Sequence, residues 1–158
     1  SESYLKEELC ALEEEGFEVV DHRVVPDDKI KVQAALKVYC REFDVDLVVT
    51  TGGTGLSPRD VTPEATAEVI ETQIPGLAEA IRAHGQARTP YAMLSRAKAG
   101  LIGRSLVVNL PGAKRAVEEG LQLLFPGLLH AFKMTGGVGH ENGMSGREGP
   151  HPEGERKG

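Results

Sequence analysis

The sequence predicts an α/β fold of three layers, in which a mostly parallel sheet is covered by helices on both faces. Two short apolar runs, DLVVTT at 46–51 and SLVVNL at 105–110, have the composition of strands buried on both faces. Segments with helical periodicity alternate with these runs, which is the order of elements in parallel sheets. A chain of 158 residues is expected to form one domain.

The overall composition limits the kinds of molecule that the protein can be expected to bind and where it can be expected to act. The chain is 40% hydrophobic and 27% charged, as in ordinary globular proteins, and its net charge is −6. We expect no nucleic-acid partner, because a phosphate backbone binds basic surfaces. No apolar run is long enough to span a membrane and no secretory signal is recognisable. Cys10 and Cys40 lack the spacing of a metal or redox site, so a cytoplasmic protein is predicted.

The first third of the chain is expected to fold as helix, strand, helix and strand. Leucines recurring on one face favour a helix over residues 3–15, and a strand-like stretch follows over 17–25. Asp27 or Asp28 can then cap a helix over 29–43. The apolar strand over 46–51 comes next and opens into a glycine-rich loop.

The next helix begins at Thr62-Pro63-Glu64, with Thr62 as its N-cap, and is expected to run to about residue 72. Short helical segments are expected over 77–84 and 89–96, and a brief strand between Gly100 and Gly103. After the strand over 105–110, a helix over 113–124 should be interrupted at Pro126 and resume over 128–134.

Residues 135–158 differ from the rest of the chain. They are rich in glycine and charge and nearly devoid of large apolar side chains, so burial cannot offset the entropy of ordering them. We therefore predict a folded domain over 1–134 and a disordered tail over 135–158.

The loop TTGGTGLSPRD, residues 50–60, is the first candidate for ligand binding. Its glycines allow positive φ and close approach to backbone N–H groups, which can form a concave site for an anion. It matches neither the P-loop nor the dinucleotide-binding glycine pattern. An ordinary glycine-rich turn is the alternative interpretation.

Acidic residues beside helix starts form the second candidate feature. Asp60 ends the glycine-rich loop just before a helix. Its carboxylate can interact favourably with the positive end of the helix dipole, or it can bind a Mg²⁺ ion that bridges phosphates. Asp27 and Asp28 have the same two interpretations. Spacing alone favours capping, and a metal role requires that these residues lie at the same crevice.

A second loop, NLPGAK at 109–114, presents Gly112 at a helix start that carries Lys114 and Arg115. The helix dipole disfavours cations there, so their presence hints at an anionic ligand. Ser95-Arg96 pairs a hydroxyl with a bidentate donor suited to phosphate, although a solvated arginine fits the pattern equally well. The five histidines show no metal-ligand spacing.

Taken together, these residues resemble the molybdopterin adenylyltransferase family, which comprises Mog- and MoaB-type proteins and the G domain of gephyrin. The resemblance covers about residues 1–135 and is carried, in order, by FEVVDHRVVPDD, DLVVTTGGTGLSPRDVTPEAT, IPGLAEAIR, TPYAMLSRAKAGLIGRSLVVNLPG and FPGLLHAF. It implies that the dithiolene-bearing pterin attacks the α-phosphate of ATP with Mg²⁺, giving adenylated molybdopterin and pyrophosphate. It further implies a homotrimer and a partner protein for molybdenum insertion.

The resemblance also implies roles for individual residues. Asp27 and Asp60 match the family's essential acidic pair, which would act in catalysis and organise Mg²⁺ and nucleotide. The residues that would bind nucleotide, pterin or phosphate are Thr51, Gly52, Gly53, Thr54, Gly55, Ser57, Ser95, Arg96, Pro111 and Gly112.

Three departures from the family pattern qualify this reading. Family members open with a strand of the type V-T-V-S-D, whereas this chain begins SESYL, so we expect that the first strand is missing from the chain and that residues precede it. Ala113 replaces a residue that is often polar, and the tail has no counterpart. A non-catalytic molybdopterin-binding or scaffold homologue is the alternative function, and part of a longer fusion protein is a third possibility.

Overall fold

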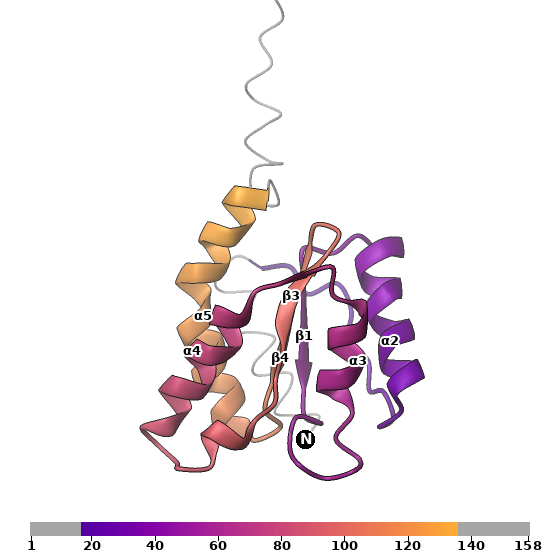
Figure 1. Cartoon of the computed structure of the whole chain (residues 1–158). Coiled ribbons are helices and arrows are strands. Elements are labelled where there is room, and N and C mark those ends of the chain that lie inside the picture. Colours follow the sequence, from indigo (N-terminus) through magenta and orange to yellow (C-terminus); the bar gives the residue numbers. More distant parts are fainter. Residues whose placement is uncertain (1–16, 136–158) are drawn as a thin grey trace, which may run out of the picture.

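Within the described residues, 17–135, the computed structural model has one sheet whose strands lie in the order β1-β4-β3-β2. The strands are β1 (Leu47–Thr51), β2 (Thr72–Gln73), β3 (Ala99–Ile102) and β4 (Ser105–Leu110). Helices α4 (Pro75–Gln86) and α5 (Lys114–Thr135) lie on one side of the sheet, and α2 (Lys29–Lys37) and α3 (Thr62–Val69) lie on the other (Figure 1).

The predicted α/β fold with helices on both faces is confirmed, and the sheet is mixed rather than mostly parallel. β1 pairs with β4 in parallel, whereas β3 is antiparallel to both β4 and β2. The physical reason is the short connection between β3 and β4, Gly103-Arg104, because a two-residue turn can join only antiparallel strands. Gly103 has φ +59°, which such a turn requires.

Alternate side chains of β4 divide the core into two clusters. Leu106, Val108 and Leu110 pack with α4 and α5, whereas Val107 packs with α2 and α3 on the opposite face. Every residue of β4 is buried, as predicted from its composition. β1 is only half-buried, because β4 is its only neighbour among the described strands.

Helix α2 begins as predicted and then presents a different face. The Asp28 carboxylate accepts a hydrogen bond of 3.1 Å from the backbone N–H of Lys31, which confirms it as the N-cap. Leu36 and Cys40 face the sheet, whereas Ile30, in the first turn, is 68% exposed. The chain continues from α2 into a π-helical segment, η1 (Val38–Glu42), which completes the expected helix.

Helix α5 runs through Pro126 without the expected interruption. Leu121, Leu124, Leu128 and Phe132 are all buried on one face of this helix. Burying each such side chain contributes about 1.5–3 kcal/mol, and together they outweigh the roughly 3 kcal/mol that proline costs inside a helix. Among the helices of residues 17–135, none combines the length and apolar character needed to cross a membrane.

Residues 17–25 do not form the expected strand. Phe17 instead packs against Phe125 and Phe132 of α5, with ring centroids 5.7 and 5.9 Å apart. Asp21 accepts a hydrogen bond of 2.7 Å from the Tyr39 hydroxyl. A strand needs a hydrogen-bonded neighbour, and none of the described strands pairs with this segment. The predicted helix over 3–15 lies outside the described residues, as does the predicted tail beyond residue 135.

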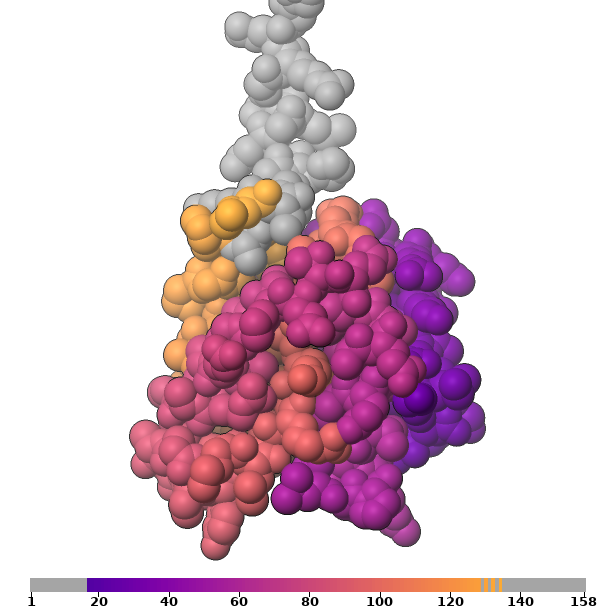
Figure 2. Space-filling model, viewed as in Figure 1, coloured from indigo at the N-terminus to yellow at the C-terminus, as the bar shows by residue number. Residues whose placement is uncertain are grey.

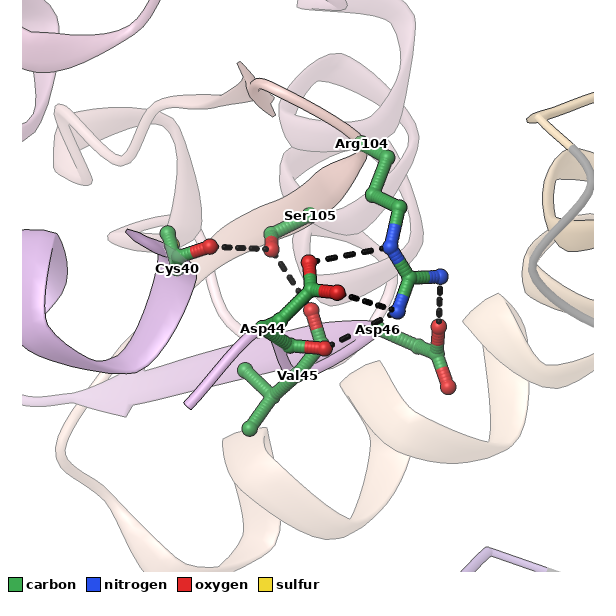
Figure 3. A network of polar contacts seen from close by, with 6 residues as sticks. All are labelled: Cys40, Asp44, Val45, Asp46, Arg104 and Ser105. Carbon is green, nitrogen blue, oxygen red and sulfur yellow. Dashed lines mark hydrogen bonds and ion pairs between the residues drawn. The ribbon is translucent and has the colours of Figure 1, made fainter. Parts of the chain in front are cut away.

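Arg104 binds two aspartates at the end of the sheet at which β1 begins (Figure 3). From the β3–β4 turn, Arg104 donates to Asp44 Oδ1 at 2.9 Å and to Asp46 Oδ1 at 2.8 Å. The neighbouring Ser105 hydroxyl donates to the Val45 carbonyl at 2.6 Å. These contacts fix the start of β1 against the hairpin, at the end of the strand opposite to its glycine-rich loop.

Candidate functional site

The two loops singled out in the sequence meet at one edge of the sheet. β1 and β4 are parallel with Thr51 opposite Leu110, so both strands end together. The backbone N–H of Gly52 donates to the Leu110 carbonyl at 3.0 Å. A Cβ added to Gly112 would lie 3.2 Å from the Gly52 Cα, so the loops are in contact. This edge is where ligands bind in sheets of this type.

The glycines of the β1–α3 loop adopt the conformations that only glycine tolerates well. Gly52 and Gly53 have φ +87° and +68°. A Cβ on Gly53 would lie 2.3 Å from Thr62 Oγ1, and the Gly53 carbonyl accepts a hydrogen bond of 3.2 Å from the Thr62 N–H. The prediction of Thr62 as N-cap is therefore wrong by one residue: Val61 is the N-cap and Thr62 begins α3, because the Thr62 hydroxyl is packed against the loop.

Asp60 is half-buried at the end of the same loop. Its carboxylate Oδ2 accepts from the Ser57 N–H at 3.0 Å, and its own N–H donates to the Ser57 carbonyl at 2.9 Å. A Cβ on Gly55 would come within 2.8 Å of the same Oδ2. Ser57 and Gly55 therefore determine where the Asp60 carboxylate lies.

Arg96 contacts this loop at Thr54, Gly55 and Asp60. Its guanidinium donates from Nε to the Gly55 carbonyl at 2.9 Å and from Nη2 to the Asp60 carbonyl at 2.9 Å. Its Nη1 pairs with the carboxylate of Glu64 in the first turn of α3. Hydrogen bonding from Arg96 lowers the pKa of Glu64 below the usual range. The backbone N–H of Arg96 donates to the carbonyl of the buried Thr54 at 2.9 Å.

The structure brings together most of the predicted site residues. Ser95 joins Arg96 at the loop, its hydroxyl lying 3.4 Å from the hydroxyl of Thr54. Pro111 and Gly112 follow the end of β4, and Gly112 contacts the loop at Gly52. Asp27 is exposed in the bend before α2, and its side chain makes no hydrogen bond or ion pair within the described residues, 17–135. The N-terminal end of α2 nevertheless lies at the same end of the sheet as the β1–α3 loop (Figure 1).

Asn109 is a buried polar residue that the sequence interpretation missed. Its amide nitrogen donates to Thr50 Oγ1 at 2.8 Å and to Thr66 Oγ1 at 3.0 Å, while its Oδ1 accepts from the Lys98 N–H at 3.1 Å. It is fully buried and ties β1, α3 and the segment before β3 to β4, just before the second loop. The signal was present as a single amide in an otherwise apolar strand.

An open hollow adjoins the Arg96 side of the loop. The chain that leads into β3 is seen between α3 and α4 (Figure 2). The hollow is lined by Pro63, Glu64, Ala67, Arg82, Ser95, Arg96, Ala97 and Lys98. Small side chains are among this lining, and its basic residues suit an anionic ligand.

The fold and these loops define an α/β domain with a candidate ligand site at the carboxyl ends of two parallel strands. Comparison with known proteins makes this class specific. The family model described as "Probable molybdopterin binding domain" matches residues 4–130, and the chain belongs to this family.

Individual relatives agree with that assignment. A molybdopterin biosynthesis enzyme MoaB from Thermus thermophilus has a similar structure, with TM-score 0.77, 40% identity and coverage of 86% of this chain and 84% of that one. The Helicobacter pylori protein named molybdopterin adenylyltransferase is 41% identical over 107 residues, which are 68% of this chain and 61% of the relative.

A longer relative from Chlorobaculum tepidum, named molybdenum cofactor biosynthesis bifunctional protein, is 37% identical over 129 residues. These residues are 82% of this chain and 41% of the relative. The chain thus spans less than two thirds of the length of both curated relatives.

Proposed function

We propose that this chain acts in molybdenum cofactor biosynthesis by adenylating molybdopterin with ATP, giving adenylated molybdopterin and pyrophosphate. The observation that carries the proposal is the contact between the β1–α3 and β4–α5 loops, which places glycine backbone and the Asp60 carboxylate at one edge of the sheet. The name of the Helicobacter pylori relative supports the same activity.

The acidic residues are suited to Mg²⁺. In the described part of the chain no three Asp, Glu, His or Cys side chains gather into a protein-only metal cage. Mg²⁺ usually takes only one or two carboxylates, together with water and substrate phosphates. Asp60, with Asp27 from the same end of the sheet, would supply this ligand set. Bound there, the ion would neutralise charge on the phosphates of ATP.

The remaining residues of the site would act through binding and orientation. Backbone N–H groups at Gly52 and Gly53, together with the hydroxyls of Thr51 and Ser57, would hold phosphate oxygens. In the reaction a nucleophilic oxygen of the pterin forms a bond to the α-phosphorus of ATP. The bond from that phosphorus to the β-phosphate oxygen breaks, and pyrophosphate leaves with the electron pair. Such chemistry depends on positioning and charge stabilisation more than on proton transfer.

Release of pyrophosphate from ATP and Mg²⁺, with and without molybdopterin, tests the proposal. We expect release that depends on molybdopterin in the unmodified protein and a loss of at least about 100-fold in Asp60→Asn. Asn at this position can still accept the Ser57 N–H, so folding should persist. Molybdopterin binding without any release would contradict the proposal and favour the non-catalytic homologue.

We further propose, from the resemblance, that the protein is a cytoplasmic homotrimer that delivers adenylated molybdopterin to a metal-insertion partner. Light scattering of the purified protein tests the assembly, and a monomeric mass at assay concentration would contradict it.

A further inference from the structure

The Arg96 guanidinium joins the segment before β3 to the β1–α3 loop and to the first turn of α3, which are remote from it in sequence. It donates to the carbonyls of Gly55 and Asp60, at the two ends of one loop segment, and pairs with Glu64 in α3. The site residues that would contact substrate therefore depend on a side chain from the segment just before β3.

We infer that Arg96 and Glu64 form a positioning pair that holds the β1–α3 loop and the Asp60 carboxylate in place. This inference rests on the proposed function for its activity readout. Nε, Nη1 and Nη2 of the guanidinium each donate one N–H group to a protein oxygen, so three of its five donors fix its plane against the loop and α3.

The geometry of the fork explains why arginine occupies this position. Three donors fixed in one plane can reach two carbonyls and a carboxylate at once, whereas a lysine ammonium is a single point charge. The carbonyl contacts bracket residues 55–60, the segment in which Ser57 binds the Asp60 carboxylate. Displacing either end of the segment would therefore move that carboxylate.

Glu64 completes the arrangement from α3. Its side chain is 48% exposed and that of Arg96 is 35% exposed, so the pair lies at the rim of the hollow rather than in the core. An ion pair this exposed contributes little to global stability. Its effect should therefore be on the local geometry of the loop, with the fold left intact.

The decisive experiment compares Arg96→Lys and Glu64→Gln with the unmodified protein. Hydrogen exchange of the Ser57 amide reports the loop directly, and steady-state kinetics separate kcat from KM. Arg88→Lys and Glu119→Gln, which alter an Arg–Glu pair between the turn after α4 and helix α5, are the matched controls. We expect faster exchange at Ser57 and a kcat lowered about 10- to 100-fold in Arg96→Lys, with KM values within about twofold.

Glu64→Gln retains the length of the side chain and both carbonyl contacts of Arg96, so we expect a smaller effect in the same direction. It also keeps the test available should Arg96→Lys fail to fold. A raised KM with unchanged kcat and unchanged Ser57 exchange would instead make Arg96 a ligand-binding residue and overturn the inference. If the unmodified protein shows no turnover, the proposed function fails, and Ser57 exchange alone decides the positioning role.

Discussion

Gly52 and Gly112 face one another across the candidate site, and their contact is asymmetric. A Cβ on Gly112 would lie 3.2 Å from the Gly52 Cα, whereas a Cβ on Gly52 would lie 3.9 Å from the Gly112 Cα. Gly52 also has positive φ, so its backbone excludes other residues for a separate reason. Gly112 is therefore the position at which the spacing of the two loops can be changed with one methyl group.

We predict that Gly112→Ala lowers turnover about tenfold while the protein stays folded. The added methyl must push the loops apart by a few tenths of an ångström, and small misplacements of reacting groups reduce rates strongly. Pyrophosphate release and thermal unfolding measure the two effects. Gly76→Ala in α4, where a Cβ meets nothing within 4 Å, is the control. Full activity of Gly112→Ala would show that loop spacing is not critical.

Asn109→Ala should destabilise the fold by roughly 1–3 kcal/mol, because the buried amide satisfies partners in β1, α3 and the segment before β3. Thr66→Val removes only one acceptor and should cost less. Asn109→Asp should be worse than either near neutral pH, since it places a carboxylate in a fully buried position. Urea unfolding measures all three. If Asn109→Ala has the same free energy of unfolding as the unmodified protein, the hydrogen-bond network has no role in stability.

Substitutions of the two neighbouring aspartates before α2 should have different effects, one on stability and the other on activity. Asp28 caps the helix, so Asp28→Ala should lose roughly 0.5–2 kcal/mol of unfolding free energy with turnover kept. Asp27 is exposed and does not cap, so Asp27→Ala should keep stability and lose Mg²⁺-dependent turnover. The proposed metal role of Asp27 is refuted by a variant whose Mg²⁺ dependence matches the unmodified protein.

The Glu64–Arg96 pair predicts a pH dependence of defined sign. Arg96 holds the pKa of Glu64 below the ordinary glutamate value of 4.5, so folding favours the ionised form. The stabilisation is complete above that value and is lost as the pH falls through the lowered pKa of the folded state. Unfolding of the unmodified protein and of Glu64→Gln, followed from about pH 7 to about pH 3, should therefore converge at the acid end. Curves that stay parallel would exclude a contribution from ionised Glu64.

Local signals in the sequence were sufficient for the elements that carry the site. The apolar strands over 46–51 and 105–110, the Asp28 cap and, to within one residue, the start of α3 are all encoded within a few residues. Parallel pairing then brings both glycine loops to one edge, which is why the two loops could be identified without coordinates.

Features that depend on residues distant in sequence could not be predicted from local sequence patterns. The contacts of Arg96 with the loop and α3 are of this kind, because the residues it bonds, Gly55 and Glu64, are remote from it in sequence. Helix α5 passes Pro126 because its burial against the sheet outweighs a local penalty. The segment over 17–25 has a strand-like composition, but pairing decides strand formation, and pairing is a tertiary property.

The mixed sheet has a consequence for the order in which the chain folds. The β3–β4 hairpin closes through a two-residue turn, and such hairpins form within about 1–10 μs. β1 must wait for a partner that follows α3, α4 and β3, and contacts of such sequence separation slow folding. Arg104 meets Asp44 and Asp46 only when that long loop closes. The β1–α3 and β4–α5 loops extend from these two strands. We therefore expect the candidate site to form in the late, slow phase of folding, after β4 has been synthesised.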